Sequence, residues 1–586
     1  MKDDRRGRPR PLLSVLAAAF TASSVIGGSL AFFPPPPSHL RAAGGRTALR
    51  EGAVACDGAA NGAAEDAAED AAEDAPPRRY FATCVPGLQD ALAREIGELP
   101  GTADVEPSGS AGVGFSGPAD GSAGLRALLW LRTAHRVMEL VGTTEGTGEA
   151  LYDRDDLYAF VRETVDVKNL LGDGRGGLLA LSVRAVPNGR PPKDLCHTHY
   201  TALTVKNALV DAVRDLRDDG TRPSVDLEDP DVPLVAVLRG WGGTSAQCSL
   251  YRCLHSGGSL HRRGYRIGGD GQGGRGESSG AGGGGGGGAI VHKAALKETL
   301  AAGLLLEAGW DRLVAAARED GRGAVLVDPM AGSGTLALEA ALIAADVAPG
   351  LMRIRAHRKG EDGWNPHQIP PAVRWRGGDM DGWKALLTEA AQRARDGAAW
   401  AGGAIGEGGG TGGANCEIYA NELDPRAAGL ARSCIGRAWV AGDLIRLTEG
   451  NCEDWDLGGE SEGADAASRA VVEGRTIVVS NPPWGKRLTE DIDESWEGLR
   501  TFLRRECDGA EAWVLSGNKA LTKILRMKKS RSVVVKTADE DLRWLQYHIF
   551  RKKGKGSGKE DELKRRAEEG REFGQPPPSG GAESWY

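Results

Sequence analysis

Val325-Leu-Val-Asp328-Pro-Met-Ala-Gly332-Ser-Gly334-Thr335 is the stretch of sequence that decides the fold. It is an apolar strand that enters a turn whose glycines let the backbone approach a ligand, and a helix follows at once over residues 336–345. No Lys-Ser/Thr pair follows, which excludes a Walker phosphate loop, and the three-glycine spacing of the dinucleotide fingerprint is missing. We therefore predict a nucleotide-type site at the carboxyl end of a strand.

The sequence around this stretch alternates between helical and strand patterns from residue 289 onward. A helix, a strand, the Gly-rich turn, a helix, a second strand, an acid, a helix and a third strand follow one another, interrupted by a Gly-rich insert at residues 402–413. Such a succession is typical of a doubly wound parallel sheet. We predict an α/β domain over residues 289–551.

The second strand of this domain ends in acidic residues, in Glu417-Ile-Tyr-Ala-Asn421-Glu422-Leu-Asp424-Pro. An acid at this position can accept hydrogen bonds from both hydroxyls of a ribose. Glu422 is the first candidate and Asp424 the second. Asp424 fits a helix N-cap before Pro425 equally well, and the sequence leaves both interpretations open.

The third strand leads directly into a proline loop with an aromatic residue, in Thr476-Ile-Val-Val-Ser480-Asn481-Pro-Pro-Trp484. An exocyclic amine is a poor nucleophile because its lone pair is delocalised into the ring. The side-chain oxygen of Asn481 and the carbonyl of Pro482 can accept its two hydrogens, while Trp484 stacks on the base. Pro482 and Pro483 stiffen the loop, so that the acceptors are aimed in advance. This motif predicts methylation of a base amino group.

Two small α+β modules are predicted before the sheet domain, over residues 78–150 and 151–266. The first contains expected strands at 80–85 and 112–115 and expected helices at 88–99 and 125–141. The second contains expected strands at 178–183 and 234–238 and an expected helix at 199–216.

The rest of the 586 residues, which include 86 glycines, is not expected to form a core. We predict a leader with an acidic segment at 1–77, a Gly-rich linker at 267–288 and a disordered tail at 552–586. The net charge of −8 does not indicate a nucleic-acid binder, but local charge matters more for phosphate contacts. Basic residues gather at 262–266 and at 519–536; the second run could line an RNA path or form a solvated helix face.

Cysteine and histidine spacing does not indicate a metal site. The nine cysteines include no Cys-x-x-Cys pair, which argues against both a zinc ribbon and a disulfide framework. His197-x-His199 has no partner ligand nearby and is interpreted as a surface pair.

The N-terminus has the pattern of a targeting segment. A basic start precedes an apolar stretch at 11–33, and a Ser/Ala/Arg segment without acids continues to residue 50. This is similar to the bipartite plastid leaders of algae with secondary plastids, and a mitochondrial presequence is the alternative. A permanent membrane anchor is a third interpretation, because the apolar stretch is nearly long enough to span a bilayer. We expect no stable membrane association once the leader is removed.

Taken in order, the three motifs resemble those of THUMP-domain RNA guanine-N2 methyltransferases, whose bacterial members modify large-subunit rRNA. The resemblance extends over most of residues 80–550 and covers the first catalytic half of the bacterial enzymes. It implies a class I Rossmann-like methyltransferase sheet preceded by ferredoxin-like and THUMP RNA-binding modules. Segments outside the motifs carry it too: 82–88, 131–137, 156–158, 222–226, 256–266 and the lead-in helix 294–306.

The resemblance implies S-adenosylmethionine (SAM) as the cofactor and RNA as the partner. Asn451 stands where relatives usually have Asp, and Trp484 replaces the commoner Tyr or Phe. The implied catalytic residues are Asn481, Pro482, Pro483 and Trp484. The implied cofactor-binding residues are Asp328, Pro329, Ala331, Gly332, Gly334, Thr335, Glu422, Asp424, Asn451 and Cys452. The implied RNA-binding residues are Arg262, Arg263, Arg266, Lys486 and Arg487.

Three functional hypotheses follow. The first is SAM-dependent N2-methylation of a guanine in RNA, above all large-subunit rRNA of an organelle. The second is a THUMP-type tRNA guanine-N2 methyltransferase, because the motif recognises an amine and not a particular RNA. The third is a non-catalytic RNA-binding ribosome-assembly factor, which Asn451 favours and the intact Asn481 motif disfavours. The oligomeric state cannot be predicted from the sequence.

Overall fold

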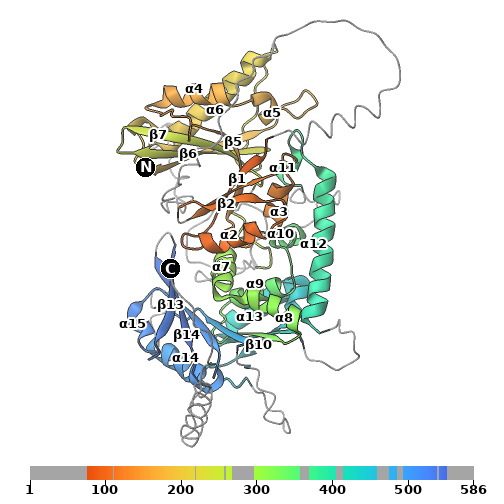
Figure 1. The fold of residues 1–586 in the computed structure, drawn as a ribbon, viewed down its shortest axis with the longest axis vertical. Helices are drawn as coiled ribbons and strands as arrows, with labels where there is room; N and C mark the ends of the chain where they lie inside the picture. Colours follow the sequence, from red (N-terminus) through yellow and green to blue (C-terminus); the bar gives the residue numbers. More distant parts are fainter. Residues whose placement is uncertain are drawn as a thin grey trace, which may run out of the picture.

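The computed structural model describes residues 76–109, 111–217, 219–256, 259–266, 296–356, 369–403, 414–457, 471, 474–484, 492–537 and 540–550. The predicted leader (apart from its last two residues), the linker at 267–288 and the tail at 552–586 lie outside these ranges. The described chain forms two seven-stranded sheets with their helices, one above the other along the long axis of the molecule (Figure 1).

The N-terminal sheet is shared by the two predicted front modules. Its strand order is β2-β3-β1-β4-β7-β6-β5, and β4 pairs antiparallel with β7 to join the modules edge to edge. Strand β5 pairs parallel with β6, and the other neighbours are antiparallel. The strands are β1 (Arg78–Thr83), β2 (Ala103–Pro107), β3 (Gly112–Gly117), β4 (Arg136–Thr143), β5 (Leu181–Gly189), β6 (Val232–Trp241) and β7 (Ser245–Cys253).

Helices cover one face of this sheet and enclose the first core, which runs through both modules. Alternate residues of β1 and β6 belong to this core, such as Tyr80 and Ala82, because one side of each strand packs on the helices, while residues between them are buried on the other face. The helices are α2 (Gln89–Gly97), α3 (Ser122–Trp130), α4 (Arg154–Thr164), α5 (Val167–Leu171) and α6 (Thr198–Leu216), with a 3₁₀ turn at Lys193–Leu195.

The predicted helix over 125–141 is wrong in its second half. Helix α3 ends at Trp130, Leu131 is extended, and β4 begins at Arg136. The apolar residues after 136 fit helical spacing, but they pair across the sheet with β1, where Val137 lies opposite Ala82 and Met138 opposite Phe81. Tertiary pairing therefore overrides the local pattern.

The C-terminal sheet has the order β10-β9-β8-β11-β12-β14-β13. Its first five strands are parallel, and β14 and β13 continue it in antiparallel fashion. This confirms the predicted doubly wound α/β sheet. The strands are β8 (Ala324–Asp328), β9 (Cys416–Glu422), β10 (Ile445–Glu449), β11 (Thr476–Ser480), β12 (Glu511–Ser516), β13 (Lys529–Lys536) and β14 (Asp541–His548).

Helices pack on both faces of this sheet, so its central strands are buried throughout. Every residue of β8 and β11 is buried, as expected for parallel strands covered on both sides. The helices are α7 (Glu298–Ala308), α8 (Trp310–Asp320), α9 (Thr335–Ala344), α10 (Pro349–Ala356), α11 (Pro371–Arg374), α12 (Met380–Ala401), α13 (Pro425–Arg437), α14 (Ile492–Glu506) and α15 (Lys519–Thr522), with a 3₁₀ segment at Trp439–Leu444.

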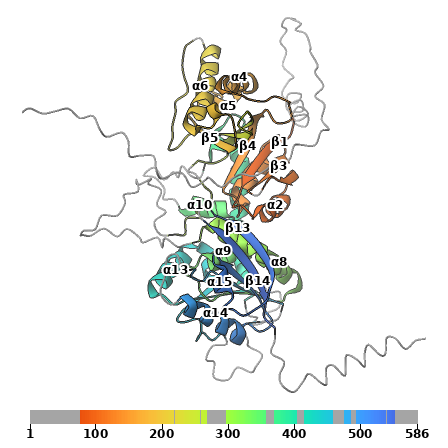
Figure 2. The ribbon, with the colours of Figure 1, turned by 90° about the vertical axis from the view of Figure 1, so that its left-hand side faces the viewer.

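Long elements connect the two sheets. Helix α12 runs along the side of the molecule past both layers, and the β13–β14 hairpin points from the lower sheet toward the upper one (Figures 1 and 2). Within the described ranges no single helix is long and apolar enough to cross a membrane; α9 and α10 meet that test only as a pair, bent by 113°.

Candidate functional site

The candidate site lies where the C-terminal sheet changes winding direction, between β8 and β11. Strands β9 and β10 lie to one side of β8, whereas β12 lies beyond β11, so the loops after β8 and β11 diverge and leave a crevice. A pocket occupies this position. It is lined by Leu296, Asp328, Met330, Ala331, Gly332, Ser333, Thr335, Leu336 and Asn481.

Asp328 ends β8 in the floor of this pocket. Its side chain is almost fully buried, and Oδ1 accepts a hydrogen bond from the Met330 amide at 3.3 Å. Its Oδ2 is buried and has no partner among the described residues. Burial raises the pKa of this carboxyl to about 8, with a smaller contribution from the negative charge of Glu422. The pocket thus offers one acceptor that awaits a donor or a cation.

The glycine loop after β8 is fixed by Glu422 at the end of the neighbouring strand. Glu422 Oε2 accepts a hydrogen bond from the Gly332 amide at 2.6 Å, and Oε1 accepts one from the Asp424 amide at 2.9 Å. Gly332 and Gly334 have φ values of 56° and 76°, which L side chains rarely adopt. The predicted ribose acceptor is therefore beside the pocket, where it also shapes the loop.

The other predicted cofactor residues have different positions. Asp424 caps α13, where its Oδ1 accepts from the Arg426 amide at 2.9 Å, which is the second of its two predicted interpretations. Asn451 Oδ1 accepts from the Glu453 amide at 3.1 Å, and the side chain of Cys452 is buried. None of these three lines the pocket described above. Pro329 lies in the loop, and its carbonyl accepts from Asn421 Nδ2 at 3.4 Å.

The Asn481-Pro-Pro-Trp484 loop forms the opposite wall. Asn481 lines the pocket, and its Oδ1 is buried without a partner among the described residues. Trp484 is partly buried against the C-terminal core and lies beside Gly517, where an added Cβ would be 3.3 Å from its ring. The site therefore combines an unpartnered amide oxygen with an aromatic ring on one short loop.

Trp496 of α14 holds this loop in place. Its indole nitrogen donates a hydrogen bond to the Pro483 carbonyl at 2.8 Å, and the side chain is fully buried. Trp496 was not predicted as part of the site, because nothing in the sequence around it indicates a contact with Pro483, 13 residues earlier in the chain. Those intervening residues, which include the predicted RNA contacts Lys486 and Arg487, lie outside the described residues.

Asn421 was also missed as a functional residue, although it stands next to Glu422. Its Nδ2 donates to the Gly450 carbonyl at 2.9 Å, and its Oδ1 accepts from the Thr448 hydroxyl at 3.0 Å. Together with the Pro329 contact, these bonds connect the ends of three neighbouring strands. Asn421 therefore fixes the edge of the sheet on which the pocket is built.

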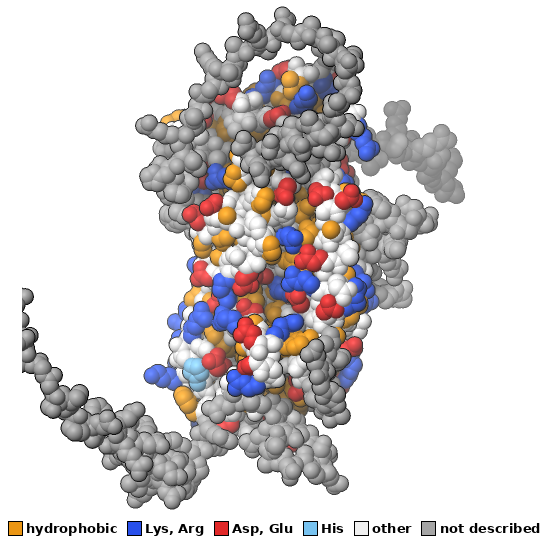
Figure 3. All heavy atoms as spheres, turned by 45° about the vertical axis from the view of Figure 1, so that its right-hand side comes forward, with side chains coloured by type: hydrophobic (Ala, Val, Ile, Leu, Met, Phe, Trp, Pro, Cys, Tyr) orange, Lys and Arg blue, Asp and Glu red, His pale blue; other side chains and the backbone are white. Residues whose placement is uncertain are grey.

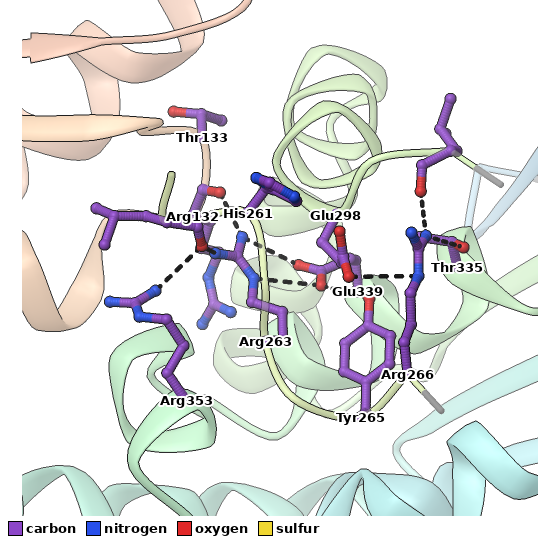
Figure 4. A network of polar contacts seen from close by, with 12 residues as sticks. Arg132, Thr133, His261, Arg263, Tyr265, Arg266, Glu298, Thr335, Glu339 and Arg353 are labelled. Carbon is purple, nitrogen blue, oxygen red and sulfur yellow. Dashed lines mark hydrogen bonds and ion pairs between the residues drawn. The ribbon is translucent and has the colours of Figure 1, made fainter. Parts of the chain in front are cut away.

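Figure 4 shows a buried polar network behind the pocket, at the junction of the two sheets. Arg263 is fully buried and forms an ion pair with Glu339 of α9 at 3.4 Å, and Tyr265 donates to the same carboxylate at 2.8 Å. The prediction that Arg263 contacts RNA is therefore wrong, because its charge is neutralised inside the protein. The neighbouring Arg262 is exposed.

Arg266 extends this network to the pocket wall. It donates to the Thr335 hydroxyl at 2.9 Å and to the Leu296 carbonyl, and it pairs with the buried Glu298 at 3.3 Å. Thr335 and Leu296 both line the pocket. Arg266 is thus engaged in protein contacts in this structure, and it connects the segment after β7 to the candidate site.

Family comparisons match the chain in three places. An RlmL ferredoxin-like domain matches residues 79–138, a THUMP domain matches residues 182–240, and an RMKL-like methyltransferase domain matches residues 289–409. These matches confirm the predicted fold class and the family resemblance. The match to a methyltransferase domain also confirms the prediction that SAM is the cofactor.

The sequences of curated relatives can be aligned with most of this chain. It is 32% identical over 458 residues to a ribosomal RNA large subunit methyltransferase K/L of Pseudomonas entomophila, which covers 77% of this chain and 50% of the relative. It is 32% identical over 475 residues to the protein of the same name from Syntrophotalea carbinolica, which covers 81% and 54%. The chain therefore spans about half the length of the curated relatives it matches.

Solved structures show the same fold. A "possible methylase" from Clostridium difficile 630 has a TM-score of 0.57 at 20% identity and covers 82% of this chain and 100% of its own. The protein SMU.472 complexed with SAH has a TM-score of 0.56 at 18% identity, over 82% of this chain and 100% of its own.

Proposed function

Because this chain carries an RlmL-type ferredoxin-like domain, a THUMP domain and an RMKL-like methyltransferase domain, we propose that it transfers a methyl group from SAM to the N2 amino group of a guanine in large-subunit rRNA. The single observation that carries the proposal is the buried, unpartnered Asn481 Oδ1 in a pocket with the equally unpartnered Asp328 Oδ2. The names of the curated relatives support rRNA as the substrate.

The residues of the pocket fit the cofactor. A buried polar atom without a partner is costly, so Asp328 Oδ2 marks a place where a ligand group belongs. The left-handed glycines bring backbone close to the ligand, and Glu422 is the acceptor for ribose hydroxyls. When bound, SAM would supply an electrophilic methyl group, and Asp328, Gly332 and Glu422 are the residues that would hold the cofactor.

Asn481 and the proline loop act on the amine that receives the methyl group. The amide oxygen of Asn481 and the Pro482 carbonyl accept the two amine hydrogens, which turns the nitrogen lone pair away from the ring system. Trp484 stacks on the extruded base. Both acceptors of the loop are uncharged, because one is a side-chain amide oxygen and the other a backbone carbonyl. Among the described residues that line the pocket, only Asp328 carries a carboxyl group. The proton is lost to solvent after transfer, when the nitrogen has become acidic.

Replacement of Trp496 by Phe tests the positioning of this loop. The variant keeps a buried aromatic ring but loses the hydrogen bond to Pro483, which is worth about 1 kcal/mol. We expect kcat to fall by roughly five- to tenfold while the Kd for SAM is unchanged. Trp513→Phe is the matched control, since the buried Trp513 indole nitrogen has no partner among the described residues. A similar loss of kcat in both variants would contradict a positioning role.

The pKa of Asp328 predicts how SAM affinity changes with pH. A raised folded-state pKa means that the cofactor-free protein retains a proton up to about pH 8, so this group's contribution to stability falls as pH rises from about 4 to about 8. The positive charges of SAM favour the carboxylate, and binding below pH 8 then releases a proton. We expect the affinity, measured by calorimetry, to rise with pH up to about 8 and to be constant above it.

The Asp328→Asn variant should bind SAM weakly and without this dependence on pH. Asp381→Asn, an exposed carboxylate on α12, should retain the wild-type profile. A wild-type affinity that stays flat between about pH 6 and 8 would show that Asp328 does not bear the linked proton.

Methyl transfer from labelled SAM to purified RNA pools tests the proposed function. The RNA products are digested to nucleosides and identified by mass. We expect N2-methylguanosine in large-subunit rRNA. Label confined to tRNA would move the substrate to the tRNA alternative. Measurable SAM binding without label in any pool, including pre-ribosomal particles, would favour the non-catalytic assembly factor.

The organellar location is a further part of the proposal. It rests on the basic and apolar N-terminal pattern at 1–50, which lies outside the described residues. Expression of residues 1–77 fused to a fluorescent protein should direct the fusion to the plastid; a mitochondrial signal would support the alternative.

A further inference from the structure

A run of exposed cations lies between the end of β12 and the end of β13. The sequence from 517 to 537 contains no Asp or Glu. Arg531 pairs with Glu307 at 2.8 Å and so belongs to the protein's own packing. The other six cations of this run are exposed, and none of them forms an ion pair with a carboxylate of the described ranges: Lys519, Lys523, Arg526, Lys528, Lys529 and Lys536.

This cationic track, as we call these six residues, begins beside the catalytic loop. Gly517 lies beside the Trp484 ring, because a Cβ added to this glycine would be 3.3 Å from ring atom Cε3. Asn518 then caps α15 by accepting a hydrogen bond from the Ala520 amide at 2.8 Å. Lys519 is thus two residues along the chain from the contact with Trp484.

The other end of the track reaches the ferredoxin-like domain. The Lys536 amide donates a hydrogen bond to the Pro86 carbonyl at 3.0 Å. Gly87, with φ at 97°, lies so close to the Val534 carbonyl that an added Cβ would be 2.0 Å from the oxygen. Figure 2 shows β13 and β14 reaching up to this junction. Both ends of the track therefore lie near the carboxyl edge of the sheet, where Ser516 and Val534 are both paired with Arg543 of β14. Lys529 lies toward the opposite edge, where it and Ala512 are both paired with Tyr547.

The track is basic along its own sequence, and the acidic residues nearest to it belong to the neighbouring segment, where Asp541 is paired with Lys536 across β13 and β14 and Glu540 lies beside Gly517. The face drawn in Figure 3 carries basic and acidic side chains interspersed with each other. Some exposed cations elsewhere are paired, as Lys384 is with Asp381 at 3.0 Å, and others such as Arg395 and Arg437 have no ion pair among the described residues. What distinguishes the track is therefore the absence of acidic residues from 517 to 537. Unpaired lysines are depleted at protein–protein interfaces, whereas a row of them suits a polyanion.

We propose that the cationic track binds the backbone phosphates of the RNA strand next to the target base. The strand then runs from the base stacked on Trp484 past α15, away from the carboxyl edge of the sheet, toward Lys528 and Lys529 at the start of β13. The level of Lys529 is four residues along β14 from the level of Ser516, which is roughly 13 Å at about 3.3 Å per residue and suffices for a few phosphates. For the identity of its ligand, the proposal rests on the proposed function.

A triple substitution in the full chain tests the track: Lys523→Gln, Lys528→Gln and Lys529→Gln. The matched control removes three exposed cations outside it, with Lys384→Gln, Arg395→Gln and Arg437→Gln. Binding to a short fluorescein-labelled single-stranded RNA is measured by anisotropy over a range of salt concentrations. Loss of three phosphate contacts on a single strand should reduce the slope of log K against log salt by about 2 and weaken binding at low salt by about tenfold or more.

Activity supplies the second measurement. The track variant should show a raised KM for RNA, with the kcat at saturating RNA and the Kd for SAM unchanged. Wild-type affinity and salt slope in the track variant, or an equal loss in the control set, would overturn the proposal. The binding assay does not need methyl transfer. A lower salt slope in the track variant, with no methylation of any RNA by the wild type, would therefore support the track and contradict the proposed function. Methylation of RNA by the wild type, with equal salt slopes in the wild type and the track variant, would contradict the track alone.

Discussion

Asn481→Ala should abolish most methyl transfer while the protein still folds and binds SAM. The substitution removes the buried amide oxygen that accepts an amine hydrogen, and loss of one such preorganised group costs about 10²–10³-fold in kcat, or about 3–4 kcal/mol. The group acts chiefly when the nitrogen attacks, so the Kd for SAM should change by no more than a few-fold. Single-turnover transfer from labelled SAM to RNA measures the chemical step directly.

Ser480→Ala is the matched control for this prediction. Ser480 precedes Asn481 at the end of β11, and its hydroxyl is also buried without a partner among the described residues, but it does not line the pocket. Its removal should leave kcat within a few-fold of wild type. Methylation by Asn481→Ala at more than about a tenth of the wild-type rate would mean that the amine is oriented by another group, and an equal loss in both variants would indicate damage to the strand end.

The centre of the site could be predicted from sequence because its parts are local. Asp328 and Asn481 each end an apolar run of β-favouring residues, and parallel strands bring their carboxyl ends to one edge of a sheet. The order of the motifs along the chain is then enough to place both side chains on one pocket. Asn451 and Cys452 were harder to place, since a loop residue is not held by the register of a strand.

Features that depend on distant partners could not be predicted. Arg263 looks like an exposed base in a basic run, and its burial follows from Glu339, 76 residues further along the chain. The boundary between α3 and β4 depends on pairing with β1, which lies more than 50 residues earlier. The basic run at 519–536 was predicted either to line an RNA path or to form a solvated helix face. Within this run Lys519–Thr522 is helical, and the longer segment Lys529–Lys536 is strand β13. In each case the local pattern was compatible with two structures, and a remote contact chose between them.

The arginine segment after β7 joins the two halves of the molecule in a way that bears on function. Arg263 contacts the Arg132 and Leu260 carbonyls on the N-terminal side and Glu339 on the catalytic side. Arg353 of α10 adds hydrogen bonds to the Leu260 and Leu128 carbonyls. The sheet that carries the THUMP match is therefore held in a fixed position relative to the pocket. Under the proposed function, a fixed distance between the two parts would select the nucleotide that reaches Trp484.

Glu339→Leu should destabilise this junction more than any surface substitution. Both side chains of the Glu339–Arg263 pair are fully buried, so removal of the carboxylate leaves a guanidinium without its counter-charge and the Tyr265 hydroxyl without its acceptor. Breaking a buried pair from one side costs about 3–5 kcal/mol, whereas replacement of both partners by apolar residues is often close to neutral. We therefore expect a large fall in the urea midpoint of Glu339→Leu, followed by tryptophan fluorescence, and a substantial recovery in the Arg263→Met, Glu339→Leu double variant. Arg393→Gln, which breaks an exposed pair with Asp346, is the control and should shift the midpoint by less than about 1 kcal/mol in equivalent free energy. A single variant as stable as this control would show that water reaches Arg263 and that the junction is not held by the buried pair.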